Sequence, residues 1–208
     1  MPRTMEGLAR LIAREHVAPW IVDAFRAIDR ADFAPAVDGD RAYRDRPIGL
    51  PQAQTTSQPS LIARMVDAAA IEPGDLVLEV GTGYGFQTAI LGRGAARVIS
   101  IERSEELAGT ARSNLERAGV ANATVVRGDG WMGVPEKAPF DSIVVSAAAA
   151  EVPQALVEQL AEGGRLVIPL SGVRDDAVYV FEKIAGKLAP GRLLTPARFV
   201  PLVRPAES

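Results

Sequence analysis

The sequence predicts a doubly wound α/β fold, in which a mostly parallel β-sheet has an antiparallel C-terminal edge and a small N-terminal helical subdomain precedes it. Three observations predict it. From residue 60 onward, strand-like runs alternate with segments of helical spacing. The runs are apolar throughout, which is typical of parallel strands covered on both faces. The last two strand-like segments have no helix between them, which indicates an antiparallel pair at the sheet edge.

We expect two parts within one compact unit. Residues 1–59 form an N-terminal helical segment that leads into an active-site loop, and residues 60–208 form the main domain. Residues 5–30 have helical spacing, and Pro19 is expected to open the second of two helices. The stretch 31–59 is rich in proline and aspartate, so an ordered loop is expected there.

The elements of the main domain follow from apolar runs and from helix start and stop signals. Ser104 is expected to cap a helix that ends just before Gly119. The expected helices are 60–71, 86–95, 104–119 and 152–161. The expected strands are 76–81, 97–102, 123–129, 140–149, 164–170, 177–184 and 197–203, the last two forming the antiparallel pair.

Composition excludes several kinds of chemistry. The chain has no cysteine and one histidine, which removes disulfides, thiolate nucleophiles and multi-histidine metal sites, so we expect no bound metal. The net charge of −3 argues against a general nucleic-acid binder. No apolar run approaches the roughly 20 residues of a membrane helix, and the first residues do not resemble a signal peptide. We therefore expect a cytoplasmic protein.

A glycine-rich turn, "LEVGTGYGF", follows the first predicted strand of the main domain and precedes a helix. Its glycines, Gly81, Gly83 and Gly85, allow a sharp turn and a close approach of the backbone to a ligand. Phe86 occupies the position where a dinucleotide fingerprint requires its third glycine, which disfavours NAD. The pattern indicates a nucleotide-like ligand that lacks a pyrophosphate.

Acidic residues mark the ends of three successive predicted strands. Glu79 suits an ammonium group, Glu102 can accept hydrogen bonds from both hydroxyls of a ribose, and Asp129 can bind an exocyclic amine. Parallel sheets of this kind bind ligands at the carboxyl ends of their strands. S-adenosylmethionine has an amino-acid end, a ribose and an adenine, so we expect it as the cofactor, with S-adenosylhomocysteine as its product.

With these motifs, most of the chain resembles the protein-L-isoaspartate O-methyltransferases, which have a Rossmann-like methyltransferase fold. "LVLEVGTGYGFQTAIL" and "VISIERSEEL" are similar to the family's donor loop and ribose strand. "QTTSQP", residues 54–59, resembles a signature that general methyltransferases lack. The resemblance implies methylation of isoaspartyl residues in damaged proteins or peptides. It also implies that the donor is bound by Thr55, Glu79, Gly81, Thr82, Gly83, Tyr84, Gly85, Glu102, Arg103, Asp129 and Gly130.

The resemblance also implies that Thr55, Thr56 and Ser57 lie between donor and acceptor, with Ser57 as the catalytic residue. A carboxylate acceptor with a pKa near 4 is already ionised at pH 7, so no general base is needed. Because the sequence offers Ser57 no evident histidine–aspartate partnership, we expect it to orient the acceptor and not to act as a covalent nucleophile. The alternative is that Ser57 caps the helix that starts near Ser60.

Two departures from the family pattern concern the acceptor side. The loop "IGLPQAQTTSQP" is about two residues longer than usual, and Pro51 is expected to stiffen it. Ala150 stands where the family has proline, so a freer loop is expected there. Five basic residues between Lys183 and Arg204, with no acid among them, form either a solubilising surface or an attractant for an acidic peptide.

These departures leave the acceptor open. The leading hypothesis is repair of isoaspartyl residues through a succinimide. The alternative is a family relative that methylates a carboxylate of one maturing peptide or of a small molecule. A third hypothesis, a donor-binding protein without catalysis, is disfavoured by the intact acids and Ser57. We expect a monomer whose partner is an isoaspartyl peptide or protein, with neither nucleic acid nor membrane.

Overall fold

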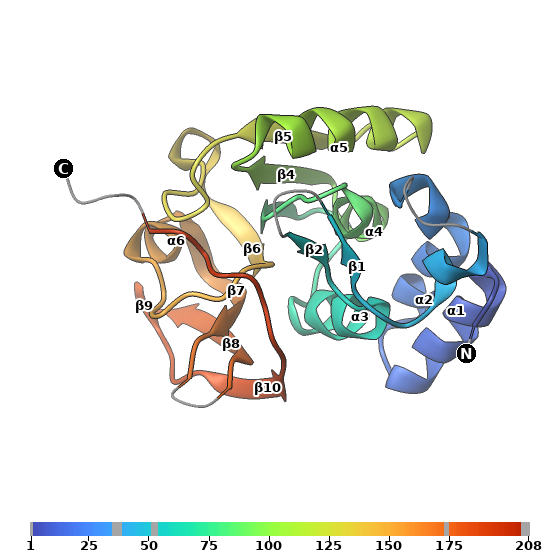
Figure 1. Cartoon of the computed structure of the whole chain (residues 1–208). Coiled ribbons are helices and arrows are strands. Elements are labelled where there is room, and N and C mark those ends of the chain that lie inside the picture. Colours follow the sequence, from blue (N-terminus) through green and yellow to red (C-terminus); the bar gives the residue numbers. More distant parts are fainter. Residues whose placement is uncertain (1, 35–38, 51–53, 173–174, 205–208) are drawn as a thin grey trace.

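A computed structural model describes residues 2–34, 39–50, 54–172 and 175–204. A central sheet runs through the molecule, with helices α1 and α2 at one end and the antiparallel strands β8–β10 at the other (Figure 1). The helices are α1 (Met5–Ile12), α2 (Pro19–Ala27), α3 (Pro59–Ala68), α4 (Phe86–Gly94), α5 (Glu105–Arg117) and α6 (Gln154–Gln159). Short 3₁₀ helices are η1 (Ala13–Glu15), η2 (Arg30–Phe33), η3 (Gly39–Tyr43) and η4 (Pro135–Lys137).

The main sheet has the strand order β10-β8-β7-β6-β3-β4-β5, with β9 paired to β8. Its strands are β3 (Leu76–Val80), β4 (Arg97–Glu102), β5 (Ala123–Arg127), β6 (Phe140–Val145), β7 (Leu160–Leu170), β8 (Ala177–Ile184), β9 (Lys187–Leu188) and β10 (Arg192–Pro196). The neighbouring pairs β5–β4, β4–β3, β3–β6 and β6–β7 are parallel, and β8 is antiparallel to both β7 and β10. The predicted doubly wound sheet with an antiparallel C-terminal edge is confirmed.

Apolar side chains cover both faces of the sheet, which is why its strands lack polar alternation. On one face, Val77, Val98 and Val144 join a core that helices α1 to α5 complete. On the other face, Leu78 and Ile143 pack with Leu156 of α6 and with the segments around it. Each fully buried aliphatic side chain contributes about 1.5–3 kcal/mol to the free energy of folding, so these two layers fix the strand ends that carry the site.

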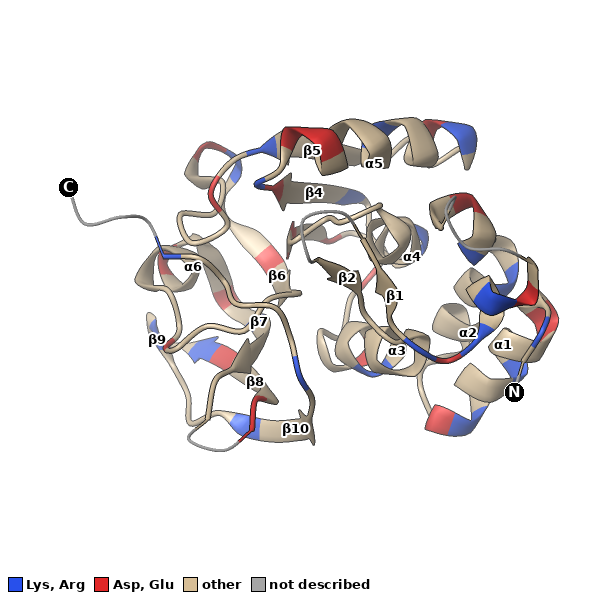
Figure 2. Ribbon diagram, in the orientation of Figure 1, with Lys and Arg blue, Asp and Glu red and all other residues tan. Residues whose placement is uncertain are grey.

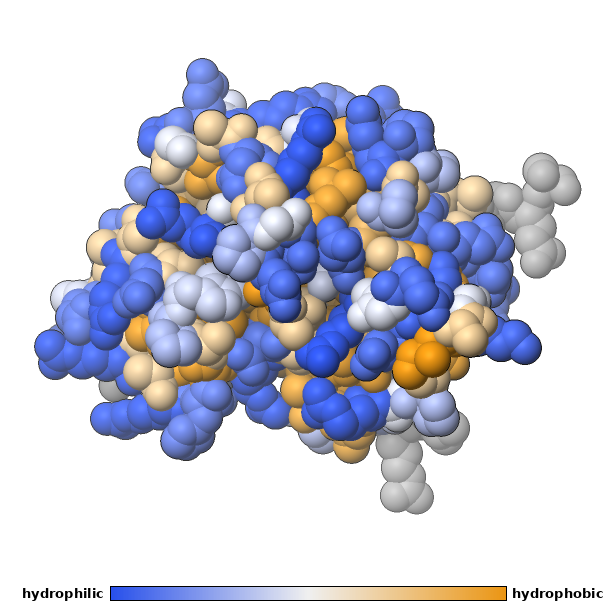
Figure 3. Space-filling view, turned by 180° about the vertical axis from the view of Figure 1, so that it is seen from behind, coloured by the Kyte–Doolittle hydropathy of each residue, from blue (hydrophilic) through white to orange (hydrophobic). Residues whose placement is uncertain are grey.

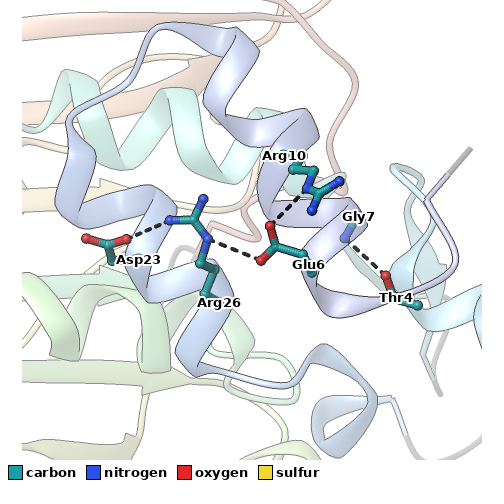
Figure 4. A network of polar contacts seen from close by, with 6 residues as sticks. All are labelled: Thr4, Glu6, Gly7, Arg10, Asp23 and Arg26. Carbon is teal, nitrogen blue, oxygen red and sulfur yellow. Dashed lines mark hydrogen bonds and ion pairs between the residues drawn. The ribbon is translucent and has the colours of Figure 1, made fainter.

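The N-terminal helices are part of the first core. Leu8 of α1 and Phe25 of α2 share a cluster with Phe86 and Ala89 of α4, so the two parts have a common core. The division at residue 59 stays a prediction. Figure 4 shows the polar contacts outside this core: Arg26 binds both Glu6 and Asp23, at 3.3 and 2.8 Å, and so links α1 to α2. Exposed pairs of this kind add little to stability.

Two predicted elements at the C-terminal side are wrong in extent. The helix expected over 152–161 ends at Gln159, and Leu160 already belongs to β7. The strand expected over 197–203 is instead β10 at 192–196, which occupies the edge of β8. Residues 197–203 run on as an extended segment, joined to the sheet's end by a bridge between Ala148 and Pro201.

The surface carries mixed charge and dispersed apolar residues. Acidic and basic residues are interspersed along the helices in Figure 2. The rear face in Figure 3 shows hydrophobic residues (orange) scattered among hydrophilic ones. Within the described ranges, no helix combines the length and apolar character needed to cross a membrane.

Candidate active site

A cavity of about 390 Å³ lies at the carboxyl ends of β3, β4 and β6, beside the small hairpin of β1 (Ile48–Gly49) and β2 (Thr55–Thr56). This is the point where the strand order reverses, at which open parallel sheets bind ligands. In Figure 1 the hairpin lies in front of the sheet, next to α3. Of the twelve residues predicted from the sequence, ten line the cavity: Thr55, Ser57, Gly81, Thr82, Gly83, Tyr84, Glu102, Arg103, Asp129 and Gly130.

The glycine-rich turn adopts a backbone that side chains disfavour. Gly81, Gly83 and Gly85 all have positive φ, between 56° and 94°. Gly83 N–H donates to Glu102 Oε2 at 2.9 Å, which ties the turn to the end of β4. Gly85 does not line the cavity; it is the N-cap residue of α4, and a Cβ there would press on Leu115 of α5 at 3.3 Å. Its position therefore serves the packing of the turn.

Glu102 and Asp129 lie in the cavity wall with part of their hydrogen-bonding capacity committed to the backbone. Glu102 Oε1 accepts a hydrogen bond from Ser104 N–H at 3.0 Å, and Asp129 Oδ1 accepts one from Trp131 N–H at 2.9 Å. These bonds fix the directions of the two carboxylates. Each carboxylate oxygen has two lone pairs, so both groups retain acceptor sites for a ligand.

Glu79 lies beneath the cavity and not in its wall. Its side chain is fully buried, and its Oε2 accepts hydrogen bonds from Thr88 Oγ1 and, at 2.6 Å, from Ser100 Oγ. Burial raises the pKa of Glu79 to about 7, against the opposing effect of these hydroxyls, and the nearby charge of Glu102 raises it further. The sequence marks Glu79 as a strand-end acid, but it does not reveal that the side chain turns away from the cavity.

A buried guanidinium holds the hydroxyl-bearing stretch in place. Arg30, only 2% exposed, donates to the backbone carbonyl oxygens of Ala42, Arg44 and Arg46, each at 3.0 Å. It also donates to Thr56 Oγ1 at 3.1 Å and to the carbonyl oxygen of Ser57 at 3.3 Å. Burial lowers the pKa of Arg30 to about 10, so it stays charged at neutral pH.

Asp45 completes this support from the other side. Its carboxylate accepts hydrogen bonds from Ser60 N–H and Oγ–H, both at 2.9 Å, and from Gln58 Nε2 at 2.8 Å. Helix α3 begins at Pro59 with Gln58 as its N-cap residue, so the alternative that Ser57 caps this helix is wrong. The prediction that Pro51 stiffens the loop falls on residues outside the described ranges.

A second cavity, of about 300 Å³, adjoins the first. Its wall includes Arg64 and Arg198 and the segment from Thr195 to Val200. The residues that line both cavities are Thr55, Thr56, Ser57, Ser146 and Val200. A row of hydroxyl groups therefore lies at the junction, where one group bound in each cavity can meet.

The C-terminal segment closes one side of the first cavity through Val200, Pro201, Leu202 and Val203. Its backbone pairs with Ala148 through two hydrogen bonds, of 2.8 and 2.7 Å. Glu151, beside Ala150, pairs with Arg204, whose guanidinium lies 4.9 Å from the centre of the Trp131 ring. The pair of Glu151 and Arg204 is exposed and adds little to stability, so the expectation of a freer loop at Ala150 stays a prediction.

Three of the five basic residues between Lys183 and Arg204 contact other groups of the chain. Lys183 Nζ donates to the carbonyl oxygens of Val157 and Leu160 at 2.8 and 2.7 Å, behind the end of α6. Arg198 pairs with Asp175 at 3.3 Å, and Arg204 pairs with Glu151. Of the five basic residues, only Arg198 lines the second cavity, and the choice between a solubilising surface and an attractant for an acidic peptide stays a prediction.

Sequence reasoning missed Arg30, Gln87 and Ser146. Gln87 and Ser146 line the first cavity and are linked by a hydrogen bond of 2.9 Å between Gln87 Nε2 and Ser146 Oγ. No local pattern marks these residues, because their partners are 12 to 59 residues away in the chain. No group of three or more acidic or histidine side chains in the described part of the chain could hold a metal ion.

Comparison with known proteins identifies what this site resembles. A model of the family described as protein-L-isoaspartate(D-aspartate) O-methyltransferase matches residues 6–207. The protein-L-isoaspartate O-methyltransferase of Koribacter versatilis is 49% identical over 88% of this chain and 82% of its own length. The protein of the same name from Anaeromyxobacter dehalogenans is 46% identical over 88% of each chain.

Solved structures agree on the fold. A structure titled protein-L-isoaspartate O-methyltransferase superposes with a TM-score of 0.88 and 32% identity, covering 95% of this chain and 65% of that longer chain. A second, from Plasmodium falciparum and in complex with S-adenosyl-L-homocysteine, has a TM-score of 0.82 at 23% identity, covering 98% and 99%. At that identity the second likeness concerns the fold alone.

The raised pKa of Glu79 predicts a pH-dependent loss of stability. In the unfolded chain this carboxyl group has its ordinary pKa of 4.5, and in the folded protein the value is about 7. The folded state therefore binds the extra proton, and the free energy of unfolding falls as pH rises from about 4.5 to about 7, by up to ~3 kcal/mol. Urea denaturation of the wild type and of Glu79→Gln across this range measures it. A difference between the two proteins that does not change with pH would contradict the prediction.

Proposed function

Because the chain belongs to the protein-L-isoaspartate(D-aspartate) O-methyltransferase family, we propose that it methylates the free carboxylate of L-isoaspartyl residues in damaged proteins or peptides, with S-adenosylmethionine as donor. The following backbone amide nitrogen then attacks the ester carbonyl and expels methanol, which gives a succinimide, and hydrolysis by water reopens this ring in part as normal aspartate. One observation carries the proposal: Thr55, Thr56 and Ser57, which all bear hydroxyl groups, line both cavities, of which the first is proposed to hold the donor and the second the acceptor.

The first cavity fits the donor. Its carboxylates, Glu102 and Asp129, suit the two ribose hydroxyls and the adenine amine, and the positive-φ turn at Gly81 and Gly83 exposes backbone to the amino-acid end. When bound, S-adenosylmethionine supplies an electrophilic methyl group on a sulfonium. Glu79 contributes indirectly, through the buried hydroxyls of Thr88 and Ser100 that it holds beneath the turn.

The chain's own residues orient the acceptor and do not move a proton from it. The acceptor carboxylate is ionised at neutral pH, so it needs no base. Thr56 Oγ1 is already bound to Arg30 and to Ile48 N–H, at 3.1 and 3.2 Å, and so fixes the hairpin. Ser57 contacts Arg30 through its backbone carbonyl oxygen. We assign its hydroxyl to the acceptor carboxylate, which it holds in line with the methyl group.

The second cavity is proposed to take the peptide around the isoaspartyl residue. An isoaspartyl linkage adds a methylene to the backbone, so the peptide must bind in an extended form. The wall formed by Pro47, Gln58 and residues 195–200 is open to such a chain, and the guanidinium groups of Arg64 and Arg198 suit its carbonyl or carboxylate oxygens.

General repair is preferred to a dedicated acceptor, because relatives that are 40–49% identical bear the isoaspartate name. We further propose a monomer that acts in the cytoplasm and binds neither nucleic acid nor membrane. The mixed charge of the surface, the net charge of −3 and the absence of cysteine support these assignments. Genome neighbourhood distinguishes repair from the maturation of one peptide.

A pair of matched peptides tests the function. Labelled S-adenosylmethionine is incubated with the protein and with an isoaspartyl peptide or its aspartyl twin. We expect methyl incorporation into the isoaspartyl peptide alone. Its free carboxylate is one methylene closer to the backbone than that of the aspartyl twin, and the hydroxyl-bearing residues between the two cavities are proposed to hold a carboxylate at that distance. Equal labelling of the twins, or labelling of neither while S-adenosylhomocysteine still binds, would exclude the repair function.

Replacement of Ser57 tests its proposed role. In Ser57→Ala we expect kcat/KM for the isoaspartyl peptide to fall by roughly 10- to 100-fold, the effect of one hydrogen bond to a charged group. The dissociation constant of S-adenosylhomocysteine, measured by calorimetry, should change little. Ser57→Thr keeps the hydroxyl and serves as the matched control. A collapse of cofactor binding in the alanine variant would place Ser57 in the donor site or in folding.

A further inference from the structure

The second cavity has two cationic side chains in its wall and no acidic one among the described residues that line it. The cations are Arg64 of α3 and Arg198 of the C-terminal segment. A cleft lined by charges of one sign focuses their field and attracts ligands of the opposite sign. The cavity therefore favours an anionic ligand over a neutral one.

The two arginines differ in what surrounds their charge. Arg198 is exposed and lies 3.3 Å from a carboxylate oxygen of Asp175, which offsets its charge from outside the cavity wall. Arg64 is half-buried, and in the described part of the chain it forms no ion pair. The nearest acid on its own helix, Asp67, accepts a hydrogen bond from Ala18 N–H at 2.8 Å. Arg64 is therefore the cation in this wall whose charge a ligand can neutralise.

One hydrogen bond within the chain fixes the guanidinium of Arg64. Its Nη2 donates to the carbonyl oxygen of Leu194 on β10 at 3.2 Å. Leu194 lies at the point where β10 shifts register against β8, so its carbonyl oxygen is free for this contact. A guanidinium has five N–H groups, and the described chain binds one of them, which leaves four for a ligand. Two of these in parallel can bind both oxygens of a carboxylate.

Arg64 lies away from the junction where methyl transfer is proposed. It lines the second cavity alone, whereas the hydroxyl-bearing residues 55–57 line both. Its anchor, Leu194, immediately precedes the wall segment 195–200, and Val200, the last residue of that segment, is the one that reaches the junction. A carboxylate bound by Arg64 is therefore a second anion, distinct from the carboxylate that accepts the methyl group.

We propose that Arg64 binds a second carboxylate of the acceptor and so makes the protein select isoaspartyl peptides that carry another acidic group nearby. This inference rests on the proposed function for the identity of the acceptor. The second carboxylate belongs to an acidic side chain or to the C-terminus of the peptide. An extended chain advances about 3.3–3.6 Å per residue, so a group within about three residues of the isoaspartyl one lies within about 11 Å of it.

A panel of isoaspartyl peptides tests the proposal. Each peptide has blocked ends and carries glutamate or glutamine at one of the three positions on either side of the isoaspartyl residue, and one further pair has a free or an amidated C-terminus. We expect the wild-type kcat/KM to be about tenfold higher for the carboxylate member of at least one pair, the effect of a charge-assisted hydrogen bond. In Arg64→Gln this ratio should fall to about one. Arg64→Lys should keep part of it, because it retains the charge without the planar fork.

Arg192→Gln is the matched control. Arg192 lies on β10 close to Leu194, is exposed and lines neither cavity, so this variant removes one positive charge near the site without touching the wall. Its ratio should equal that of the wild type. Arg64→Gln also removes the hydrogen bond to Leu194, and a purely structural role would lower kcat/KM for both members of a pair alike. The ratio within a pair therefore separates recognition of the carboxylate from support of β10.

A wild type that prefers the carboxylate in no pair, or a preference that survives in Arg64→Gln, would overturn the proposal. Calorimetry with the same peptides in the presence of S-adenosylhomocysteine gives the ratio of dissociation constants without turnover. If the peptides bind with a preference that depends on Arg64 but are not methylated, the proposed function fails and the carboxylate site stands. If they are methylated without that preference, the carboxylate site fails and the proposed function stands.

Discussion

The buried guanidinium of Arg30 is the constraint on which the site depends. It gathers backbone carbonyl oxygens from residues 42 to 57 around one charge, and it lies 5.7 Å from the centre of the Phe86 ring at the start of α4. A loop of this composition has few apolar side chains to bury, so it cannot hold its own shape by packing. An arginine deprived of these partners would leave a buried charge unpaired, at a cost of several kcal/mol. The hairpin that carries these hydroxyls is thus fixed over the sheet by Arg30, a cation that lines neither cavity.

Three acids at neighbouring strand ends have two different roles. Glu102 and Asp129 lie in the cavity wall, where backbone N–H groups hold their direction: two for Glu102, from Gly83 and Ser104, and one for Asp129. Glu79 faces the opposite way, into a buried cluster of hydroxyls, and is the acid whose pKa the protein raises most clearly. Direction and burial, more than position in the sequence, decide which acid can bind a ligand and which acts on the groups behind it.

The sequence was a good guide where structure is decided locally. Uniformly apolar runs predicted the parallel strands, because burial on both faces leaves no room for polar alternation. Glycines at Gly81 and Gly83 predicted the turn, because only glycine readily adopts that backbone. It failed where distant segments decide. Leu160 is equally buried in a helix or a strand, and residues 197–203 look like a strand until 192–196 takes the edge. Arg30 and the pair of Gln87 and Ser146 act through contacts that no short window contains.

A crystal structure of the chain with S-adenosylhomocysteine tests the central claim most directly, since the claim is one of placement. The account predicts the nucleoside in the cavity at the ends of β3, β4 and β6, its ribose hydroxyls on Glu102, its adenine amine on Asp129, and its sulfur facing the side chains of Ser57 and Ser146. A nucleoside bound elsewhere, or bound there with its sulfur turned away from the hydroxyl row, would contradict it.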